Sequence, residues 1–583
     1  MSIFNLGLGM RWLGLQRQQG AKVLLVPIVV LGMSACGGGG GLPEQPATLQ
    51  SSSSAKANSE ATTTSSSDAS SSSSVPAMVT DVSLRGTVTY DSVRPQVNGN
   101  QVFLDYANVL ARPARGVTVQ LLDSLNTPIA ETTADEQGRY AFTVSPDRSV
   151  KVRVKAELVS SNYSVFVRDN TQSNAQYVLD GSLAGSGSSA VQTRDLHADL
   201  GWNMINLSYT SERQSAPFAI ADALYDSLQM VVEADRSVSL PPLDVFWSTR
   251  NVASRGDFSL GNIGSSLYST GASAIYILGH ANNDTDEFDN TVVQHEFGHF
   301  IEDKLSRSES IGGAHFLGAP IDMRVAFGEG FGNAFALMSS GGRLYLDTSG
   351  VAQQSGFGFD IETNRFGGGY YSEGAIQSIL YNLFDANNEN ADNISLGFGP
   401  ILAALRHEDY VSFDGFTSIF PFVSSLKSVV PESAAQIDEL LLAERIVGTG
   451  PYGEGETATG SIPFSLPIYQ RLTLGGSVRA CSDNVIQEYN GLGVRRFVLL
   501  EVPSSGRYTL EAVRVSGIQP SDPDFQMYRQ GRWVGSSEGP DPDRETWARN
   551  FNQGVYALSV YDAFNTDQLD STGGNVCFDV TFN

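Results

Sequence analysis

The pattern H-E-F-G-H at His295–His299 constrains this chain more than any other feature of its sequence. Residues four apart lie on one face of an α-helix, so both histidines would face the same point if residues 289–301 form a helix. Asp289 or Asn290 can cap that helix, and its apolar positions supply a face for burial. Imidazole nitrogens arranged in this way are typical zinc ligands, and Glu296 can take a proton from a metal-bound water. The alternative is a pair of helix histidines that are satisfied by other hydrogen bonds.

A catalytic zinc ion needs a third protein ligand and keeps a fourth position for water. The best candidate is Glu329, in the run G-E-G-F-G-N-A-F-A at residues 328–336, which predicts a second helix. His315 lies in a Gly-rich loop and is a weaker candidate. The alternative for Glu329 is a surface glutamate at the start of a helix.

Two motifs together resemble a known group of enzymes. The order D-x-D-E-F-D-N-x-V-V-x-H-E-F-G-H from Asp284, followed by G-E-G-F-G-N-x-F-A, resembles the gluzincin peptidases and the fungalysin-type group in particular. The resemblance implies a zinc-dependent endopeptidase that acts on polypeptides. It makes His295, His299 and Glu329 the zinc ligands and Glu296 the general base.

The sequence departs from that family at two points. The family usually has Asp four residues after the ligand glutamate, to orient a ligand histidine, and this chain has Asn333. The family often supplies a His or Tyr to stabilise the oxyanion. Here residues 370–381 resemble the later active-site helix without a His at its start, so Tyr370 or Tyr371 could donate instead. Aromatic packing at a helix entry is the equal alternative for both tyrosines.

Two further features lie close to the motif. The predicted strand Ala274–Gly279 would line the substrate cleft as an edge strand, and the alternative is an internal strand. The acidic loops at residues 284–289 and 385–392 offer oxygens that suit Ca²⁺ as a second ion, but solvated turns are the favoured interpretation of both.

The N-terminus predicts export. A basic stretch and a short apolar run end in M-S-A-C at Cys36, which resembles the bacterial lipobox and makes residues 1–36 a lipoprotein signal peptide. The alternative is an ordinary signal peptide cleaved near Ala35. Residues 37–79 are rich in Gly and Ser and predict a disordered linker.

The folded part divides into three predicted domains. Residues 80–200 resemble carboxypeptidase-regulatory-like β-sandwiches, residues 201–450 hold the α+β metallopeptidase-like domain, and residues 451–583 resemble the bacterial pre-peptidase C-terminal domain. The predicted class is therefore a multidomain chain in which an α+β domain is flanked by two β-sandwiches. Cys481 and Cys577 both fall in the last domain, where a disulfide is expected and two free thiols are the alternative.

Length and charge fit this division. A chain of 583 residues exceeds what one core supports. Its net charge of −26 disfavours nucleic acid as a partner, whereas a lipid on Cys36 would bind a membrane. We therefore expect a cell-envelope protein, anchored in the outer membrane or secreted. The rival function is a catalytically impaired metallopeptidase fold that acts in adhesion or scaffolding through its β-sandwiches.

Overall fold

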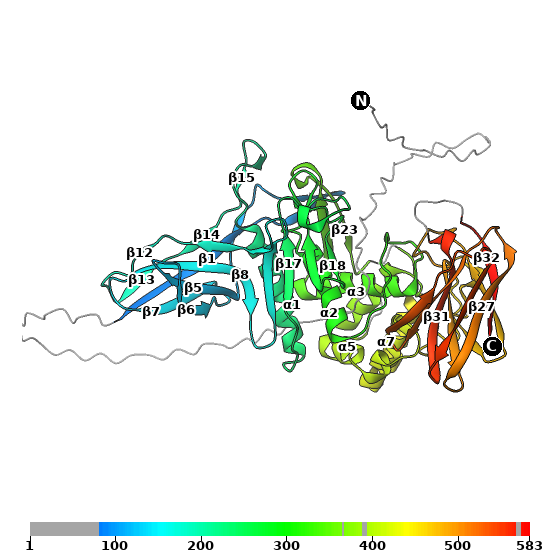
Figure 1. Ribbon diagram of the computed structural model, residues 1–583. Helices are drawn as coiled ribbons and strands as arrows, with labels where there is room; N and C mark the ends of the chain where they lie inside the picture. Colours follow the sequence, from blue (N-terminus) through cyan, green and yellow to red (C-terminus); the bar gives the residue numbers. More distant parts are fainter. Residues whose placement is uncertain (1–80, 364–365, 388–392, 567–572) are drawn as a thin grey trace, which may run out of the picture.

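The computed structural model describes residues 81–363, 366–387, 393–566 and 573–583. Three parts follow one another in the order of the sequence: a β-rich N-terminal region, a central α+β region and a C-terminal β-sandwich (Figure 1). The predicted multidomain class is confirmed. The predicted signal peptide, Cys36 and the linker at residues 37–79 lie outside the described residues.

The N-terminal region is built around strand β1 (Val82–Ser92), whose alternate side chains are buried. β1 pairs with β4 and β7 in the antiparallel sense and with β13 and β14 in the parallel sense. Alternating burial is what the period of two in a β-strand requires when one face covers a core. The strands of the region, in addition to β1, are β2 (Pro95–Asn98), β3 (Gln101–Leu104), β4 (Leu110–Pro113), β5 (Val117–Asp123), β6 (Pro128–Thr133), β7 (Arg139–Val144), β8 (Ser149–Val159), β9 (Ser164–Asp169), β10 (Ala175–Gln176), β11 (Val178–Asp180), β12 (Ala184–Gly185), β13 (Val191–Thr193), β14 (Leu196–Ala198), β15 (Trp202–Asn203) and β16 (Ser208–Tyr209).

One ten-stranded sheet joins the N-terminal and central regions. Its main path runs β18-β19-β17-β9-β8-β5-β6, and β9 pairs in parallel with β17 (Leu243–Trp247). Helix α1 (Ala216–Ala234) is tied to the N-terminal region by Arg115, whose guanidinium donates to Asp222 at 2.5 Å and to Asp226 at 2.7 Å. The two regions expected to meet at residue 200 therefore share a sheet and an ion-pair cluster.

The same sheet corrects the prediction for the strand beside the motif. β19 (Ala274–Ile277) pairs with β17 on one side and with β18 (Leu267–Ser269) on the other, so it is an internal strand. β18 lies at the end of the strand order and is the edge. The continuous apolar character of residues 274–278 is explained by this central position.

The helices of the central region carry the motif residues. α2 (Asn290–Leu305) and α3 (Met323–Ser340) match the two predicted helices, and α4 (Glu373–Phe384) packs on α3. The further helices are α5 (Phe398–Leu405), α6 (Glu408–Val411), α7 (Ile419–Val429) and α8 (Ala434–Ala443). A small sheet lies beside α2 and contains β20 (Gly279–His280), β21 (Asp284–Thr285), β22 (Leu344–Ser349) and β23 (Ser355–Asp360).

The C-terminal β-sandwich consists of a five-stranded sheet in the order β24-β26-β31-β28-β29 and a four-stranded sheet in the order β25-β32-β27-β30. Apolar residues of both sheets form a separate core. Cys481 and Cys577 face each other across β25 and β32 and form a disulfide, as predicted. The strands are β24 (Tyr469–Thr473), β25 (Ser477–Ser482), β26 (Arg495–Val502), β27 (Gly506–Gly517), β28 (Pro523–Arg529), β29 (Arg532–Ser537), β30 (Arg544–Phe551), β31 (Gly554–Asp562) and β32 (Val576–Phe582).

Within the described residues, no helix has both the length and the apolar character needed to cross a membrane.

Candidate metal centre

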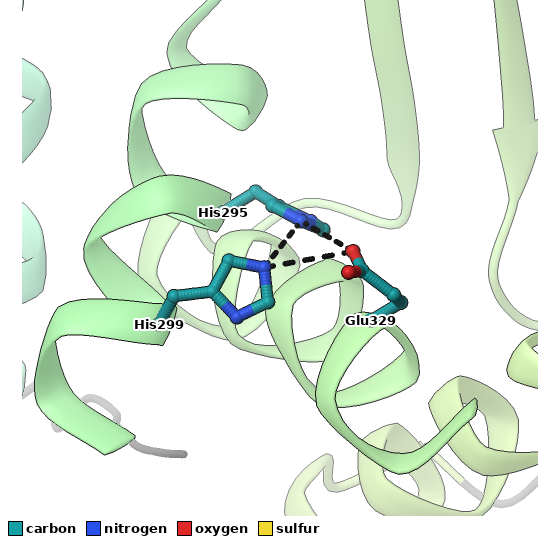
Figure 2. Close-up of side chains that lie close together, drawn as sticks. All are labelled: His295, His299 and Glu329. Atoms are coloured by element: carbon teal, nitrogen blue, oxygen red, sulfur yellow. Dashed lines mark hydrogen bonds and ion pairs between the residues drawn. The ribbon is translucent and has the colours of Figure 1, made fainter. Parts of the chain in front are cut away.

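Three side chains from two neighbouring helices converge on one point (Figure 2). His295 Nε2 lies 3.0 Å from His299 Nε2 on α2, and Glu329 Oε2 on α3 lies 3.3 Å from the first nitrogen and 3.5 Å from the second. His295 and Glu329 are buried, and the side chain of His299 is 12 % exposed. The structure thus brings the two motif histidines and the predicted third ligand together.

Small residues let the two helices approach closely enough for this convergence. A Cβ atom on Gly332 of α3 would lie 2.7 Å from Cε1 of His295, so any other residue would push on the imidazole. Gly298 of α2 faces the same contact, since a Cβ there would lie 3.4 Å from the Gly332 Cα. Glycine is therefore required at Gly332, whereas a Cβ at Gly298 would make an ordinary van der Waals contact.

The geometry fits a tetrahedral zinc ion. Ligands about 2.0–2.2 Å from zinc stand roughly 3.3–3.5 Å from one another along the edges of a tetrahedron. The separations of 3.0, 3.3 and 3.5 Å among the three atoms are close to this value. Glu329 Oε2 is fully covered and lacks a hydrogen-bond partner, which is unusual for a buried carboxylate oxygen. A cation among these three atoms would satisfy it.

The Glu329 carboxylate is held in its charged form. Burial opposes its ionisation, but His315 and His299 outweigh that effect and keep the pKa of Glu329 well below its ordinary value. An ionised carboxylate is the form that binds a metal.

Asn333 orients His295 in a way the sequence did not show. Its amide nitrogen donates to Glu373 Oε1 at 2.7 Å and to Gln377 Oε1 at 2.9 Å, so its oxygen faces His295. His295 Nδ1 lies 2.9 Å from that oxygen and donates to it, which leaves Nε2 with the lone pair that a metal needs. The carboxylate of Glu373 thus reaches His295 through the amide of Asn333.

His315 joins the site from a loop, although the sequence made it only a weak candidate. Its Nε2 lies 3.4 Å from Glu329 Oε2, and its Nδ1 lies 3.0 Å from Glu373 Oε2. Burial lowers the pKa of His315, but Glu329 and Glu373 outweigh it and raise that pKa to about 9. The ligand atoms of His295, His299 and Glu329 all lie within 4.8 Å of one another, and His315 is not part of that group. It therefore stands beside the metal position as a protonated neighbour of Glu329.

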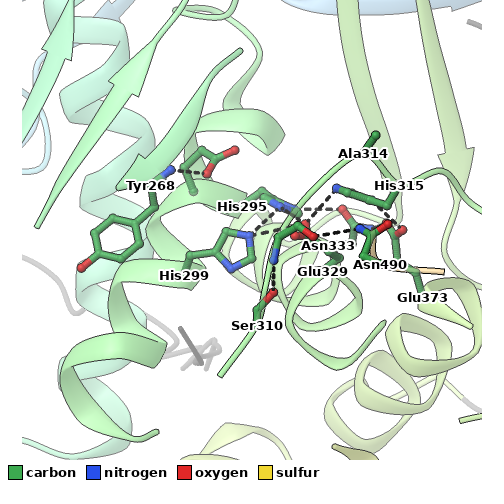
Figure 3. A network of polar contacts seen from close by, with 12 residues as sticks. Tyr268, His295, His299, Ser310, Ala314, His315, Glu329, Asn333, Glu373 and Asn490 are labelled. Atoms are coloured by element: carbon green, nitrogen blue, oxygen red, sulfur yellow. Dashed lines mark hydrogen bonds and ion pairs between the residues drawn. The ribbon is translucent and has the colours of Figure 1, made fainter. Parts of the chain in front are cut away.

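The loop that carries His315 is held by the C-terminal β-sandwich. Tyr489 Oη donates to the Ile311 carbonyl at 3.0 Å. Asn490, labelled in Figure 3, donates from Nδ2 to the Gly312 carbonyl at 2.8 Å. Gln487 Nε2 donates to the carbonyl of Ala314 at 3.0 Å. These three side chains, which we call the clamp, follow β25 and bind loop backbone that belongs to no helix or strand. A signal for such a contact is absent from the local sequence around His315.

Glu296 lies on α2 between the two ligand histidines. Its Oε2 accepts the backbone N–H of Tyr268 at 2.7 Å, so it touches the edge strand β18 (Figure 3). Burial lowers the pKa values of His299 and His315, and the charge of Glu329 raises them. The charge of Glu296 raises both pKa values by a smaller amount. Glu296 is therefore close to the metal position and to the edge of the sheet.

Tyr370 and Tyr371, which precede α4, have contacts outside the three converging residues. Tyr370 packs against Phe420 with ring centroids 5.5 Å apart, and the Tyr371 carbonyl accepts the N–H of Ile321 at 3.0 Å. Within the described part of the chain, neither tyrosine has a hydrogen bond or ion pair with His295, His299 or Glu329. The structure thus places His315, and not these tyrosines, next to Glu329.

Two other groups of potential ligands occur among the described residues. Asp91, His197 and Asp199 form an exposed group, in which His197 already bonds to Thr89 at 2.8 Å and to Asp91 at 3.1 Å. Asp284, Asp286 and Asp347 form a second group beside the start of α2. The first group is satisfied by its own contacts, whereas the second is not.

Comparisons with known proteins give only weak structural likenesses. No protein family matches the chain, and no curated protein is similar to it. A pre-peptidase C-terminal domain of a Bacillus anthracis collagenase is 13% identical over 20% of this chain and 94% of its own, with a TM-score of 0.15. The Aeromonas hydrophila PliG, a periplasmic inhibitor of g-type lysozyme, is 14% identical over 20% of this chain and 99% of its own, with a TM-score of 0.13. A family 35 carbohydrate-binding module from Clostridium thermocellum is 16% identical over 19% of this chain and 94% of its own, with a TM-score of 0.13.

Proposed function

We propose that the chain is a zinc-dependent endopeptidase that hydrolyses polypeptides. The observation that carries this proposal is the convergence of His295, His299 and Glu329, with Glu296 beside them on the same helix. Zinc bound by the three residues would supply a Lewis acid for the scissile carbonyl and for an attacking water. Residues of the chain would transfer the protons and stabilise the charge on the carbonyl oxygen.

Glu296 acts as the general base in this proposal. Its carboxylate takes a proton from the attacking water and passes it to the nitrogen of the leaving amine, so no proton is gained or lost over the reaction. The position between two ligand histidines keeps it close to that water, and the hydrogen bond from the Tyr268 N–H fixes one of its oxygens.

In this proposal His315 is the oxyanion donor, a role for which the sequence offered Tyr370 or Tyr371 as candidates. Its imidazole is buried and carries the proton, because its pKa is raised to about 9 by Glu329 and Glu373 against the effect of burial. Glu373 holds Nδ1, which leaves the Nε2–H to face the charge that develops at the carbonyl oxygen. A charged donor in a site from which water is excluded stabilises a developing oxyanion strongly.

The edge strand β18 supports a polypeptide as the substrate. It ends the ten-stranded sheet, and its Tyr268 touches Glu296. An extended peptide that added to this edge would gain main-chain hydrogen bonds and bring its backbone toward the general base. This mode of binding favours unfolded or extended segments over particular side chains.

The proposed setting is the cell envelope. A lipid on Cys36 would anchor the enzyme to the outer membrane, and cleavage near Ala35 would instead release it. The disulfide between Cys481 and Cys577 suits an oxidising compartment. The net charge of −26 disfavours nucleic acid as a partner.

Glu296→Gln tests the proposal. We expect hydrolysis of casein to fall by at least 1000-fold while the zinc content stays unchanged, because the amide cannot accept the proton but keeps the shape of the side chain. Glu233→Gln, on the exposed end of α1, is the matched control and should retain full activity. Casein hydrolysis by Glu296→Gln at the rate of the control would sink the assignment.

A second function is favoured by one observation, which is the burial of the site. Glu296 is only 1% exposed, as would suit a metal that stabilises the fold of a surface adhesion or scaffold protein. In that case the wild-type protein would contain zinc and unfold at a lower temperature after chelation, yet it would cleave no peptide. Chelator-sensitive hydrolysis by the wild-type protein decides for the peptidase.

A further inference from the structure

A group of buried carboxylates lies at the start of α2 on the side of the small sheet. Carboxylate oxygens of Asp284, Asp286 and Asp347 all lie within 4.8 Å of one another. Asp284 is on β21, Asp286 follows that strand, and Asp347 is on β22, which pairs with β21. Residues from two strands thus bring three negative groups to one place.

The oxygens of this group lack the partners that buried oxygens normally have. Asp286 is 3% exposed, and its Oδ1 has no hydrogen-bond partner, while its Oδ2 accepts from Ser266. Asp284 Oδ1 is likewise covered and without a partner. Buried carboxylate oxygens are nearly always paired, so two that are unsatisfied in one cluster indicate a missing positive group.

Asp289 adds a fourth carboxylate and links the group to the helix. It is fully buried, and its Oδ2 accepts from the N–H and the hydroxyl of Thr348, each at 2.7 Å, while its Oδ1 has no partner. The sequence predicted that Asp289 or Asn290 would cap α2 with its side chain. Asp289 does occupy the N-cap position, but its carboxylate makes no capping bond and turns to β22 instead.

The charged groups around these carboxylates are almost all negative, and His295 is the cation-forming side chain that acts on Asp347. In the part of the chain that the structure describes, no Lys or Arg forms an ion pair with any of the four, and the nearby Arg213 is bound to Glu287 at 2.6 Å. Burial, followed by the charges of Asp286 and Asp347, raises the pKa of Asp284 to about 11. Each carboxylate therefore opposes the ionisation of its neighbours unless a cation joins them.

We propose that Asp284, Asp286 and Asp347 bind a calcium ion that fastens the small sheet to the start of α2. An all-oxygen set favours a hard cation over zinc. Calcium–oxygen distances of about 2.3–2.6 Å let opposite ligands stand roughly 4.6–5.2 Å apart, so carboxylate oxygens that all lie within 4.8 Å of one another can share one calcium ion. The site is separate from the zinc centre, and its binding does not depend on peptidase activity.

A calcium ion at this position would support the helix that carries two of the proposed zinc ligands. Asp289 directly precedes the helix that carries His295 and His299, and Thr348 joins it to the strand that carries Asp347. A calcium ion would neutralise the group and hold α2 against β22 at that end. Calcium would then raise stability without entering the chemistry.

The experiment uses the full chain in zinc-containing buffer freed of calcium. We expect one calcium ion per chain on titration with CaCl₂ and a rise in Tm of several degrees. Asp286→Asn should lose both the bound calcium and the rise in Tm. Asp199→Asn, in the exposed Asp91–His197–Asp199 group, is the control and should keep both. If Asp286→Asn does not fold, the half-buried Asp347→Asn takes its place.

Three results would overturn the proposal. The first is a wild-type protein that binds no calcium, and the second is an Asp286→Asn variant that keeps the calcium-dependent rise in Tm. The third result has two parts: the wild type binds no calcium, and Asp286→Asn has a higher Tm than the wild type in calcium-free buffer. This result would show that the carboxylates share protons instead. Zinc is measured in the same samples, so a loss of calcium with zinc retained is distinguished from failure of the zinc centre.

Discussion

The metal centre has two halves that are built by different means. His295, His299 and Glu329 lie on α2 and α3, where helical spacing and the close contact at Gly332 bring them together. His315 lies on a loop with no regular structure of its own, and residues far along the chain hold that loop in place. The helical half is set by local periodicity, and the loop half is set by the clamp of the C-terminal β-sandwich.

The difference indicates a division of roles. A metal ligand must be placed accurately by rigid elements, and the helices do this. A donor that acts on the substrate can come from a loop, provided that other groups fix it. The C-terminal β-sandwich is accordingly part of the structure around the candidate metal centre and not only an appended module.

His315→Gln should separate the two halves most clearly. Loss of a charged oxyanion donor is expected to lower kcat by about 100–1000-fold, with KM and zinc content nearly unchanged. Steady-state kinetics on a fluorescent peptide, together with metal analysis, check this. Zinc lost along with activity would mean that His315 is a ligand, and an unaltered kcat would remove it from the mechanism.

The pH dependence of the metal-free protein tests the buried charge of His315. A histidine whose pKa is raised to about 9 in the folded state stabilises the protein fully below its unfolded value of about 6.5, and this contribution is lost as pH rises through 9. The free energy of unfolding after EDTA treatment should therefore fall by about 2–3 kcal/mol between pH 6 and pH 10. Urea unfolding of His315→Gln should lack this fall. An equal slope in both proteins would contradict the assignment.

Asn333→Asp should weaken the helical half, although it restores the residue that the gluzincin pattern has. Its carboxylate would face Glu373 Oε1, which now accepts from Asn333 at 2.7 Å. We expect zinc affinity to fall by about 10–100-fold in competition with a chelator. The double variant Asn333→Asp/Glu373→Gln should recover much of this loss, because an amide can donate where the two carboxylates repel. Tighter zinc binding by Asn333→Asp alone would refute the account of Asn333.

Asn490→Ala should loosen only the loop half. It removes one hydrogen bond to the Gly312 carbonyl, worth about 1 kcal/mol, so we expect kcat to fall by roughly fivefold to tenfold with zinc affinity unchanged. Asn575→Ala is the control in the same domain, since its amide bonds to Asp483 on the surface. Equal activities of the two variants would show that the clamp does not position His315.

The same contrast explains what the sequence could predict. The helices around His295–His299 and Glu329 follow from period and spacing, and the structure has them as α2 and α3. The strand at residues 274–279 was correctly identified, but its neighbours in the sheet are not encoded locally, so the edge proved to be β18. The Cys481–Cys577 disulfide could be predicted because both cysteines fall in one small domain.

Long-range contacts account for the rest. His315 and Glu373 meet across a sequence separation of 58 residues, and no spacing rule connects them. The absence of a family Asp at Asn333 was a correct observation, but only the fold shows that the carboxylate of Glu373 reaches His295 through the amide. The shared sheet across residue 200 depends on the pairing of β9 with β17, which the alternation of apolar residues cannot specify.

Metal analysis of the purified protein tests the central claim most directly, which is that His295, His299 and Glu329 bind zinc. We predict about one zinc ion per wild-type chain, less than a tenth of that in His299→Ala, and full occupancy in His280→Ala, whose histidine is exposed on β20. A wild-type protein without zinc, or His299→Ala with the same zinc content as His280→Ala, would contradict the account.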